Sequence, residues 1–388
     1  MKIIFFFILS LFLFSEIFSQ SFQVGITSKT YTDVNRNNRQ VKAEIYYPAL
    51  SAGNNTTPAN GKFPFIVFGH GFVMTYTAYE NLSSEWIPKG YIIVFANTET
   101  GFSPNHEEFG KDLRFLVNSF LMDNSNNAFL LYNKIDSASA IMGHSMGGGS
   151  SFLAAANNNS IKTVIGFAPA ETNPSAITTA ANVTVPALIL SGEKDGVTPP
   201  AQHHLPIYNA LASVCKTFVN IKGGAHCYFA KPNFNCDFGE TTSSPGISIT
   251  RQEQQQVTYD LLGLWLNYYL KNDTNSLSVF LDSLQQSNRI TYQNSCVIPS
   301  AAEVNILQKM EFEIFPNPAS DYLSVTSDEF PYELKIFSAD GRWSRLERIF
   351  EYSQCIDLST FPNGLYFVSF HYEKTVLHKK LFIVRNSF

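Results

Sequence analysis

Charged residues are sparse in this sequence, and neither sign forms a long run. Only 15% of the 388 residues are charged, and 27 basic against 32 acidic residues leave a net charge of −5. Nucleic-acid binding needs clustered positive charge, so no nucleic-acid partner is expected. Beyond the first 20 residues no segment reaches the ~18 consecutive apolar residues of a membrane helix. We therefore expect no integral membrane span in the mature chain.

The usual signatures of bound metals and phosphates are also missing. No paired histidines or cysteines stand at ligand spacing, and the His203-His204 doublet is not such a pair. Gly147-Gly148-Gly149 lacks the lysine of a P-loop and the later acid of a dinucleotide site. We therefore expect neither a metal nor a cofactor.

The N-terminus carries the one long apolar run. Lys2 precedes Ile3–Phe14, in which only Ser10 is polar. A basic start, a short apolar core and a small polar stretch are typical of a secretory signal peptide, here residues 1–20 with cleavage near Ser19 or Gln20. A buried or anchoring helix is the alternative.

Export permits disulfides, and the chain has five cysteines. Cys215 and Cys227 flank the apolar run Thr217–Ile221. If that run is a strand, at ~3.3 Å per residue its ends are too far apart for a disulfide between them. We predict Cys227 paired with Cys236 and Cys215 paired with Cys296, with buried free thiols as the alternative.

Between residues 40 and 270, short β-rich runs alternate with helical stretches. Several runs are apolar at nearly every position, as strands covered on both faces must be. This alternation predicts an α/β fold, a mainly parallel sheet flanked by helices, over residues 21–298. The expected strands are Val41–Tyr47, Phe65–Phe68, Tyr91–Ala96, Ala138–Met142, Thr163–Phe167, Ala187–Leu190 and Thr217–Ile221. The expected helices are Phe109–Leu121, Met146–Ala156, Ala201–Leu211 and Gln252–Leu270.

The texture changes after Cys296. Residues 299–311 lack sheet-like alternation and form a candidate linker. Short strand runs separated by turn pairs such as Asp340-Gly341 then predict a small all-β sandwich over residues 312–388. Its expected strands are Tyr322–Val325, Tyr332–Phe337, Tyr366–Phe370 and Val376–Val384.

Gly143-His144-Ser145-Met146-Gly147 fits the pattern G-x-S-x-G. It follows a predicted strand and opens a predicted helix, which is the context of a nucleophile elbow. Glycines allow the sharp turn that exposes the serine oxygen. We therefore predict that Ser145 is a catalytic nucleophile; a glycine-rich turn with an idle serine is the alternative.

A serine hydroxyl needs a base to remove its proton and an acid to orient that base. Of the three histidines that follow Ser145 in the first unit, His203 and His204 fall within a predicted helix and are expected on the surface. His226 follows a strand across a Gly-Gly turn and is the predicted base. The acid is Glu193 or Asp195, and Asp195 is preferred because Gly196 permits a tight turn after it.

The oxyanion of an acyl-transfer reaction needs backbone N–H donors. The residue after the nucleophile, Met146, supplies the first. Gly69-His70-Gly71-Phe72 follows the strand Phe65–Phe68, and we assign the second donor to the amide of Phe72. His70 is expected to stabilise this loop, and the Phe72 ring is expected over the acyl site.

Taken together, these residues resemble the polyester-hydrolase and cutinase-like branch of the α/β-hydrolases, which includes polyethylene terephthalate hydrolases. The similarity runs from Phe63 to Leu270. It rests on Gly-His-Ser-Met-Gly-Gly-Gly at 143–149, Val-Pro-Ala-Leu-Ile-Leu at 185–190, Leu-Pro-Ile-Tyr at 205–208 and Gly-Gly-Ala-His at 223–226. The resemblance implies a triad of Ser145, Asp195 and His226, with Phe72 and Met146 at the oxyanion hole.

One feature departs from that branch. Its members usually carry a tryptophan between the nucleophile and the acid that stacks on aromatic substrate, and no tryptophan lies between Ser145 and Asp195. The corresponding loop reads Ala-Pro-Ala-Glu-Thr at 168–172, which argues against strong binding of aromatic polyesters.

The C-terminal part resembles the sorting domain of the type IX secretion system. Phe315-Pro316-Asn317-Pro318, Gly341, Asn363-Gly364-Leu365-Tyr366 and Lys379-Lys380 carry the similarity. It implies export across the outer membrane by the type IX machinery, with later removal of this domain as one outcome. A substrate-binding sandwich is the alternative.

These observations predict a secreted, monomeric serine esterase that hydrolyses carboxylic esters, with polyesters such as polyethylene terephthalate among its candidate substrates. A lipase or acetylhydrolase of the same fold is one alternative. A non-catalytic surface or adhesion protein is the alternative from another class.

Overall fold

The computed structural model describes residues 21–297, 312–327, 332–338, 343–349, 353–372 and 375–385. The predicted signal peptide, the predicted linker and the Asp340-Gly341 turn lie outside these ranges. In the described part of the chain no helix is both long enough and apolar enough to cross a membrane.

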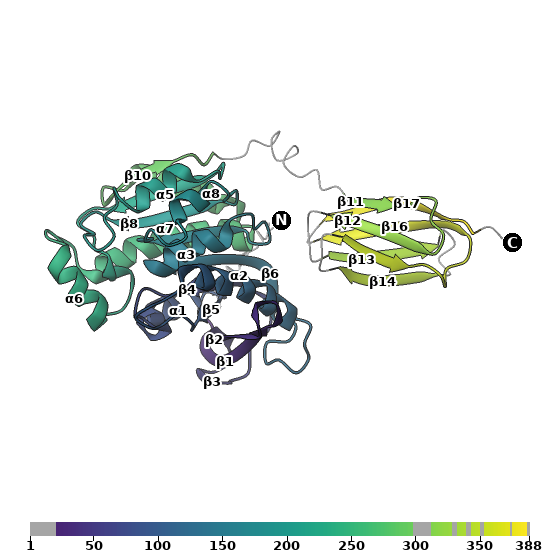
Figure 1. Cartoon of the computed structure of the whole chain (residues 1–388), viewed down its shortest axis with the longest axis horizontal. Helices are drawn as coiled ribbons and strands as arrows, with labels where there is room; N and C mark the ends of the chain where they lie inside the picture. The colour runs from purple at the N-terminus through teal and green to yellow at the C-terminus, as the bar shows by residue number, and fades with distance from the viewer. Residues whose placement is uncertain are drawn as a thin grey trace, which may run out of the picture.

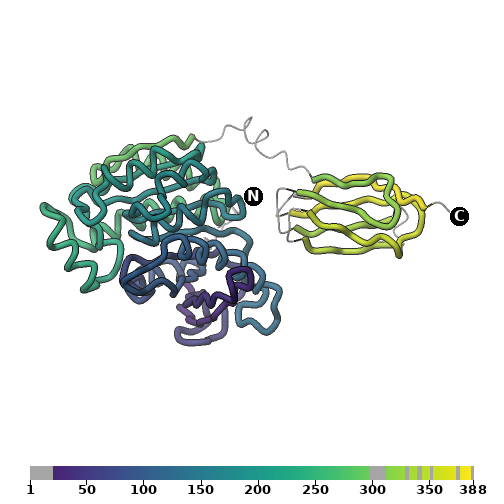
Figure 2. Tube along the Cα trace, viewed as in Figure 1, coloured from purple at the N-terminus to yellow at the C-terminus, as the bar shows by residue number. Residues whose placement is uncertain are grey.

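A ten-stranded sheet forms the centre of the first unit (Figure 1). Its middle strands are parallel, the strands that flank them pair antiparallel, and a two-residue strand at one edge pairs parallel with its neighbour. This is the expected α/β fold. Strands from the N-terminal part of this unit lie at one edge of the sheet and strands from its C-terminal part lie at the other edge, as the purple-to-green colouring of Figure 2 shows. In spatial order the strands are β10 (Ile290–Asn294), β9 (Lys216–Ile221), β8 (Ala187–Gly192), β7 (Thr163–Phe167), β6 (Ile135–His144), β4 (Phe63–Gly69), β5 (Ile92–Ala96), β2 (Arg39–Ala49), β1 (Gln23–Asp33) and β3 (Gly53–Asn54).

Helices cover both faces of this sheet, and alternate residues of the central strands pack on opposite sides. In β4, Phe65 and Val67 join one buried cluster while Ile66 and Phe68 join the other. The first cluster lies under α2 (His106–Asp123), α3 (Met146–Ala155), α4 (Ala176–Ala180) and α5 (His204–Ala210). The second lies under α1 (Glu80–Trp86), α7 (Arg251–Lys271) and α8 (Thr274–Gln286). Burial on both faces explains why these strands read as continuous apolar runs.

Two disulfide bonds join segments of this unit. Cys215, just before β9, is bonded to Cys296, which follows β10, and Cys227 is bonded to Cys236. These are the pairs proposed from the sequence. The second pair holds α6 (Phe234–Ser243), which projects from one end of the unit in Figure 1, to the short 3₁₀ helix Cys227–Phe229.

The C-terminal part contains two antiparallel sheets with a hydrophobic cluster of their own. One sheet consists of β11 (Phe312–Phe315), β12 (Tyr322–Ser327) and β15 (Ser353–Asp357). The other consists of β14 (Ser344–Ile349), β13 (Tyr332–Ser338), β16 (Gly364–Tyr372) and β17 (Thr375–Ile383). Inward-facing residues alternate along β13, where Leu334 and Ile336 are fully buried. This is the all-β sandwich that the sequence predicted.

Candidate active site

Ser145 lies at the turn between β6 and α3 in a backbone conformation that serine rarely adopts. Its φ of 55° and ψ of −120° fall in a region that costs a non-glycine residue on the order of 1–3 kcal/mol. Its N–H donates to the carbonyl of Phe167, and its carbonyl accepts the N–H of Ala170, both at 2.9 Å. These bonds hold the strained turn and set Ser145 at the head of α3, as expected of a nucleophile elbow.

The start of α3 packs directly against the loop that follows β4. A Cβ at Gly147 would lie 2.2 Å from the carbonyl oxygen of Gly69 and 2.6 Å from that of His70, so only glycine fits. This close approach brings the loop containing Phe72 next to the N-terminus of α3, which begins at Met146. N–H groups at a helix N-terminus lack intrahelical partners and favour negative charge. The Phe72 side chain is 50% exposed. The role of the Phe72 and Met146 amides as oxyanion-hole donors stays a prediction.

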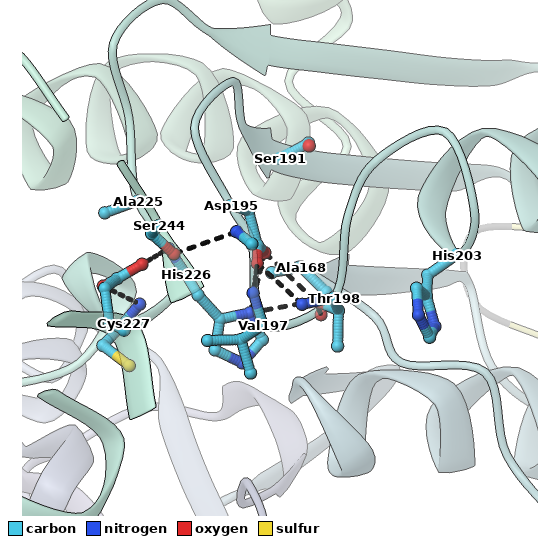
Figure 3. Close-up of polar contacts among 12 residues, drawn as sticks. Ala168, Ser191, Asp195, Val197, Thr198, His203, Ala225, His226, Cys227 and Ser244 are labelled. Carbon is cyan, nitrogen blue, oxygen red and sulfur yellow. Dashed lines mark hydrogen bonds and ion pairs between the residues drawn. The ribbon is translucent and has the colours of Figure 1, made fainter. Parts of the chain in front are cut away.

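The two carboxylate oxygens of Asp195 each receive two hydrogen bonds, because the chain turns back on itself after β8. The N–H groups of Val197 and Thr198 donate to Oδ1 at 2.9 Å and 2.7 Å. At Oδ2 the contacts are Nδ1 of His226 at 2.7 Å and the hydroxyl of Thr198 at 3.0 Å. Figure 3 shows these contacts converging on the carboxylate.

Asp195 is charged in this setting although it is buried. Burial alone would raise its pKa, but the attraction of the His226 ring and the hydrogen bonds from His226 and Thr198 outweigh that effect and hold the pKa below its ordinary value. A charged Asp195 accepts the Nδ1–H of His226, which leaves Nε2 of the neutral imidazole as a proton acceptor.

His226 and Ser145 lie on adjoining segments that His144 connects. The rings of His144 and His226 have centroids 4.7 Å apart, and Nε2 of His144 donates to the carbonyl of His226 at 3.0 Å. Within residues 21–297 the His226 ring contacts Asp195 and Thr198, and no hydrogen bond joins it to the Ser145 hydroxyl. Such bonds commonly tighten only when a substrate is bound.

Tyr79 links the same serine turn to the loop after β4. The N–H of Gly71 donates to the Tyr79 hydroxyl at 2.8 Å, and that hydroxyl lies 2.8 Å from Nδ1 of His144. Because Nε2 of His144 donates to a carbonyl, Nδ1 of the neutral ring accepts from Tyr79. Burial and the neighbouring His226 ring lower the pKa of His144 and keep it neutral. Buried hydrogen bonds thus join three loops of the candidate site.

Helix α6 is anchored to the backbone around His226. Glu240 is buried, and its carboxylate accepts the N–H of His226 at 2.5 Å and that of Cys227 at 2.8 Å. Burial raises the pKa of Glu240. The Cys227–Cys236 disulfide adds a covalent link beside these bonds. Glu240 was not predicted from the sequence, because nothing in its local sequence shows which backbone groups it contacts.

The contacts of the other candidate acid and of the other two histidines differ from those of Asp195 and His226. Glu193, the other candidate acid, accepts the N–H of Gly223 at 2.7 Å and does not reach His226. The expectation that His204 lies on the surface is wrong, since it is 0% exposed. His203 is partly buried and its Nδ1 accepts the N–H of Glu171 at 2.9 Å. In Figure 3, His203 lies apart from the Asp195 and His226 contacts.

In the described part of the chain, no group of three or more His, Cys, Asp or Glu side chains is placed so that it could hold a metal ion. His70, considered with the loop after β4, bridges two segments through its ring, with Nδ1 2.8 Å from the carbonyl of Gly71 and Nε2 2.8 Å from that of Thr98. It therefore lies within the scaffold of that loop.

Comparisons with known proteins point to one family. The sequence profile of the PET hydrolase-like family matches residues 22–245, and that of the secretion system C-terminal sorting domain matches residues 313–384. Relatives include a cutinase of Thermobifida fusca (strain YX) and cutinase est1 of Thermobifida alba, each 28% identical over 184 residues, or 47% of this chain and 56% of the relative. A bis(hydroxyethyl) terephthalate hydrolase of Streptomyces coelicolor is 26% identical over the same length, 54% of that protein.

The match spans between half and two thirds of the length of these relatives. The family profile, over residues 22–245, covers the strands and loops that carry Ser145, Asp195 and His226. The C-terminal sandwich is a sorting domain of the secretion-system type. Over more than half of its length, the chain belongs to the PET hydrolase-like family.

Proposed function

We propose that this protein hydrolyses carboxylic esters through an acyl-enzyme formed on Ser145. The observation that carries the proposal is the 2.7 Å hydrogen bond between Asp195 and Nδ1 of His226, next to a serine held in a strained turn. That bond fixes the imidazole tautomer whose Nε2 accepts a proton. A buried, charged carboxylate also stabilises the imidazolium that then forms.

In the acylation step, Oγ of Ser145 attacks the ester carbonyl carbon while its proton passes to Nε2 of His226. The resulting oxyanion is stabilised by the N–H groups of Phe72 and Met146. Collapse of the tetrahedral intermediate breaks the bond to the alcohol, which leaves with the proton from His226. Water then attacks the acyl-enzyme with His226 again as base, and the acid is released.

Short acyl esters are the first substrates we assign, and polyesters are the second. Relatives named cutinase and bis(hydroxyethyl) terephthalate hydrolase support esters of apolar acids as the class. The half-exposed ring of Phe72 offers an apolar contact beside the proposed oxyanion hole. The absence of tryptophan between Ser145 and Asp195 removes one stacking surface for an aromatic polyester, so aliphatic chains should be preferred.

The remaining parts of the chain are assigned to export. We assign residues 1–20 to a signal peptide, 21–298 to the catalytic unit, 299–311 to a linker and 312–388 to the sorting domain. The type IX machinery would recognise that last domain and carry the enzyme across the outer membrane. We assign the catalytic unit as a monomer, and every catalytic group proposed here comes from one chain.

The test is turnover of p-nitrophenyl butyrate by the purified protein, together with labelling by a fluorophosphonate. The wild-type protein should hydrolyse the ester and take up the label, and Ser145→Ala should do neither. A wild-type protein that shows neither turnover nor labelling refutes the proposal. Release of soluble products from aliphatic and aromatic polyester films, compared at equal esterase activity, then ranks the two polymer classes.

A further inference from the structure

A second histidine lies behind the acid of the candidate site. His204 opens α5, and its side chain is fully buried together with Ser191 at the end of β8. Its Nδ1 lies 2.7 Å from the Ser191 hydroxyl and its Nε2 lies 3.0 Å from the hydroxyl of Thr198. Neither His204 nor Thr198 has a part in the reaction proposed above.

Thr198 stands between the two histidines. Its hydroxyl oxygen is 3.0 Å from Oδ2 of Asp195, 2.9 Å from Nδ1 of His226 and 3.0 Å from Nε2 of His204. It also lies 3.2 Å from the carbonyl of Ala168. A hydroxyl has one proton to donate and two lone pairs to accept with. The Thr198 hydroxyl can therefore donate its proton to only one of these four neighbours.

The tautomer of His226 decides the direction. Its Nδ1 carries a proton that is donated to Asp195, so Nδ1 cannot accept from Thr198. Of the remaining acceptors, the charged carboxylate forms the stronger hydrogen bond. The Thr198 hydroxyl then donates to Oδ2 of Asp195 and has a lone pair for Nε2–H of His204.

The direction of the hydrogen bond between His204 and Ser191 follows in the same way. With its proton on Nε2, the neutral ring of His204 accepts at Nδ1, and the Ser191 hydroxyl is the donor there. Burial lowers the pKa of His204 to about 3. His204 is therefore neutral at working pH, and its 3.7 Å separation from Oδ2 of Asp195 is not an ion pair. A neutral donor does not compete with His226 for the charge of Asp195.

We propose that His204 and Thr198 are positioning residues for the active site: His204 orients the Thr198 hydroxyl so that it donates to Asp195 and holds that carboxylate in line with His226. The role rests on the proposed esterase function. It completes the four donors around the carboxylate, two backbone N–H groups at Oδ1 and two side-chain donors at Oδ2. No proton transfer along this series of hydrogen bonds is required.

Other ionisable groups around Asp195 and His226 are few. His203 and His204 lie on one side of Asp195. His144 and Glu240 pack against His226, the first through its ring and the second through a backbone N–H. None of these four donates a hydrogen bond to the Asp195 carboxylate, so removing the Thr198 hydroxyl changes the donor count at Oδ2 directly.

The test compares Thr198→Val, which keeps the shape and removes the hydroxyl, with Thr198→Ser, which keeps the hydroxyl. Loss of a hydrogen bond to a charged group should lower kcat for p-nitrophenyl butyrate about tenfold with KM unchanged. With one donor fewer, the Asp195 carboxylate stabilises the protonated ring of His226 more strongly. The acidic limb of the kcat/KM profile, which reports protonation of the base, should therefore move to higher pH by about one unit. Thr198→Ser should restore both values.

His204 is tested through its dependence on Thr198. His204→Leu removes the donor at similar size and should reproduce the kcat loss and the pH shift in part, whereas His204→Gln keeps an N–H near Nε2 and should retain most activity. In the Thr198→Val background, His204→Leu should lower kcat no further. An additive loss in the double variant would overturn the proposed coupling.

Thr163→Val is the matched control, because Thr163 is also a buried threonine whose hydroxyl bonds to Trp265 Nε1 and the Pro186 carbonyl, both at 2.8 Å. It should lower the unfolding midpoint without changing kcat or the acidic limb. Equal kcat losses in Thr163→Val and Thr198→Val, or an unchanged profile in Thr198→Val, would refute the positioning role. Absence of ester turnover in the wild-type protein would instead refute the proposed function itself.

The proton NMR signal of His226 Nδ1–H should move in Thr198→Val and stay in Thr163→Val, which gives a readout that does not need turnover.

Discussion

Replacement of Asp195 by asparagine should disable the protein with little change in its fold. Oδ1 of Asp195 accepts the N–H groups of Val197 and Thr198, so the asparagine oxygen must take that position to keep both bonds. The amide nitrogen then occupies the place of Oδ2, where it faces Nδ1 of His226 at the present 2.7 Å. Two donors cannot face each other, so His226 must hold its proton on Nε2 instead.

With Nε2 protonated, His226 cannot accept the proton of the Ser145 hydroxyl. An aspartate-to-asparagine change that locks the wrong tautomer costs about 10⁴ in kcat in a serine protease triad, and we expect a similar loss here. That factor corresponds to about 5.4 kcal/mol of transition-state stabilisation. KM should change little, because Asp195 is buried and has no part in binding the substrate.

The assay is steady-state hydrolysis of p-nitrophenyl butyrate, with thermal unfolding measured on the same samples. Glu193→Gln is the matched control, since it makes the same carboxylate-to-amide change two residues away. The contacts described for the Glu193 carboxylate are with the N–H of Gly223 and with the side chain of Lys194. It should retain wild-type kcat. Activity of Asp195→Asn within tenfold of wild type, or an equal loss in Glu193→Gln, would contradict the proposed orientation of His226.

Three further changes test the scaffold around the site. Glu240→Gln leaves only one acceptor for the two backbone N–H groups it now holds, so it should cost about 1–3 kcal/mol in urea unfolding and lower kcat more than it raises KM. Replacing Cys227 and Cys236 together by serine removes a disulfide that spans nine residues of sequence; loop-closure entropy predicts a loss of about 2.5 kcal/mol, and reduction of the wild-type protein should cost more because it also opens the Cys215–Cys296 disulfide. Gly147→Ala would place a Cβ 2.2 Å from the carbonyl oxygen of Gly69, so it should abolish fluorophosphonate labelling of soluble protein, and full labelling would show that the two segments separate easily.

The central strands were predictable because each is buried on both faces. Thr163–Phe167 was predicted within the same bounds that β7 has, and Thr217–Ile221 differs from β9 by one residue. The first strand of the sheet, Gln23–Asp33, was not predicted. It pairs along its whole length with β2, but its side chains are mostly part-exposed and polar. Only the two-residue strand β3 lies beyond it, and a strand so close to the edge of a sheet is specified by its partner more than by its own apolar pattern.

The candidate site divides in the same way. The glycine-rich turn around Ser145 carries its own local signal, because a strained strand-to-helix turn needs particular residue types at fixed spacing. Asp195 carries a weaker turn signal, because aspartate side chains often accept backbone N–H groups of the residues that follow, as this one does from Val197 and Thr198. His204 gave no such signal, since its burial depends on how α5 packs beside β8.

By itself the sequence determined the α/β layering, the serine turn and the separate sandwich, because residue type and spacing along the chain set local conformation and burial. Only the tertiary structure decided which carboxylate meets His226, that Glu240 holds the backbone beside it, and that His204 and Thr198 complete the surroundings of Asp195. Those contacts join residues from separate loops and helices. Their distances depend on how the sheet and helices pack, which no local pattern records.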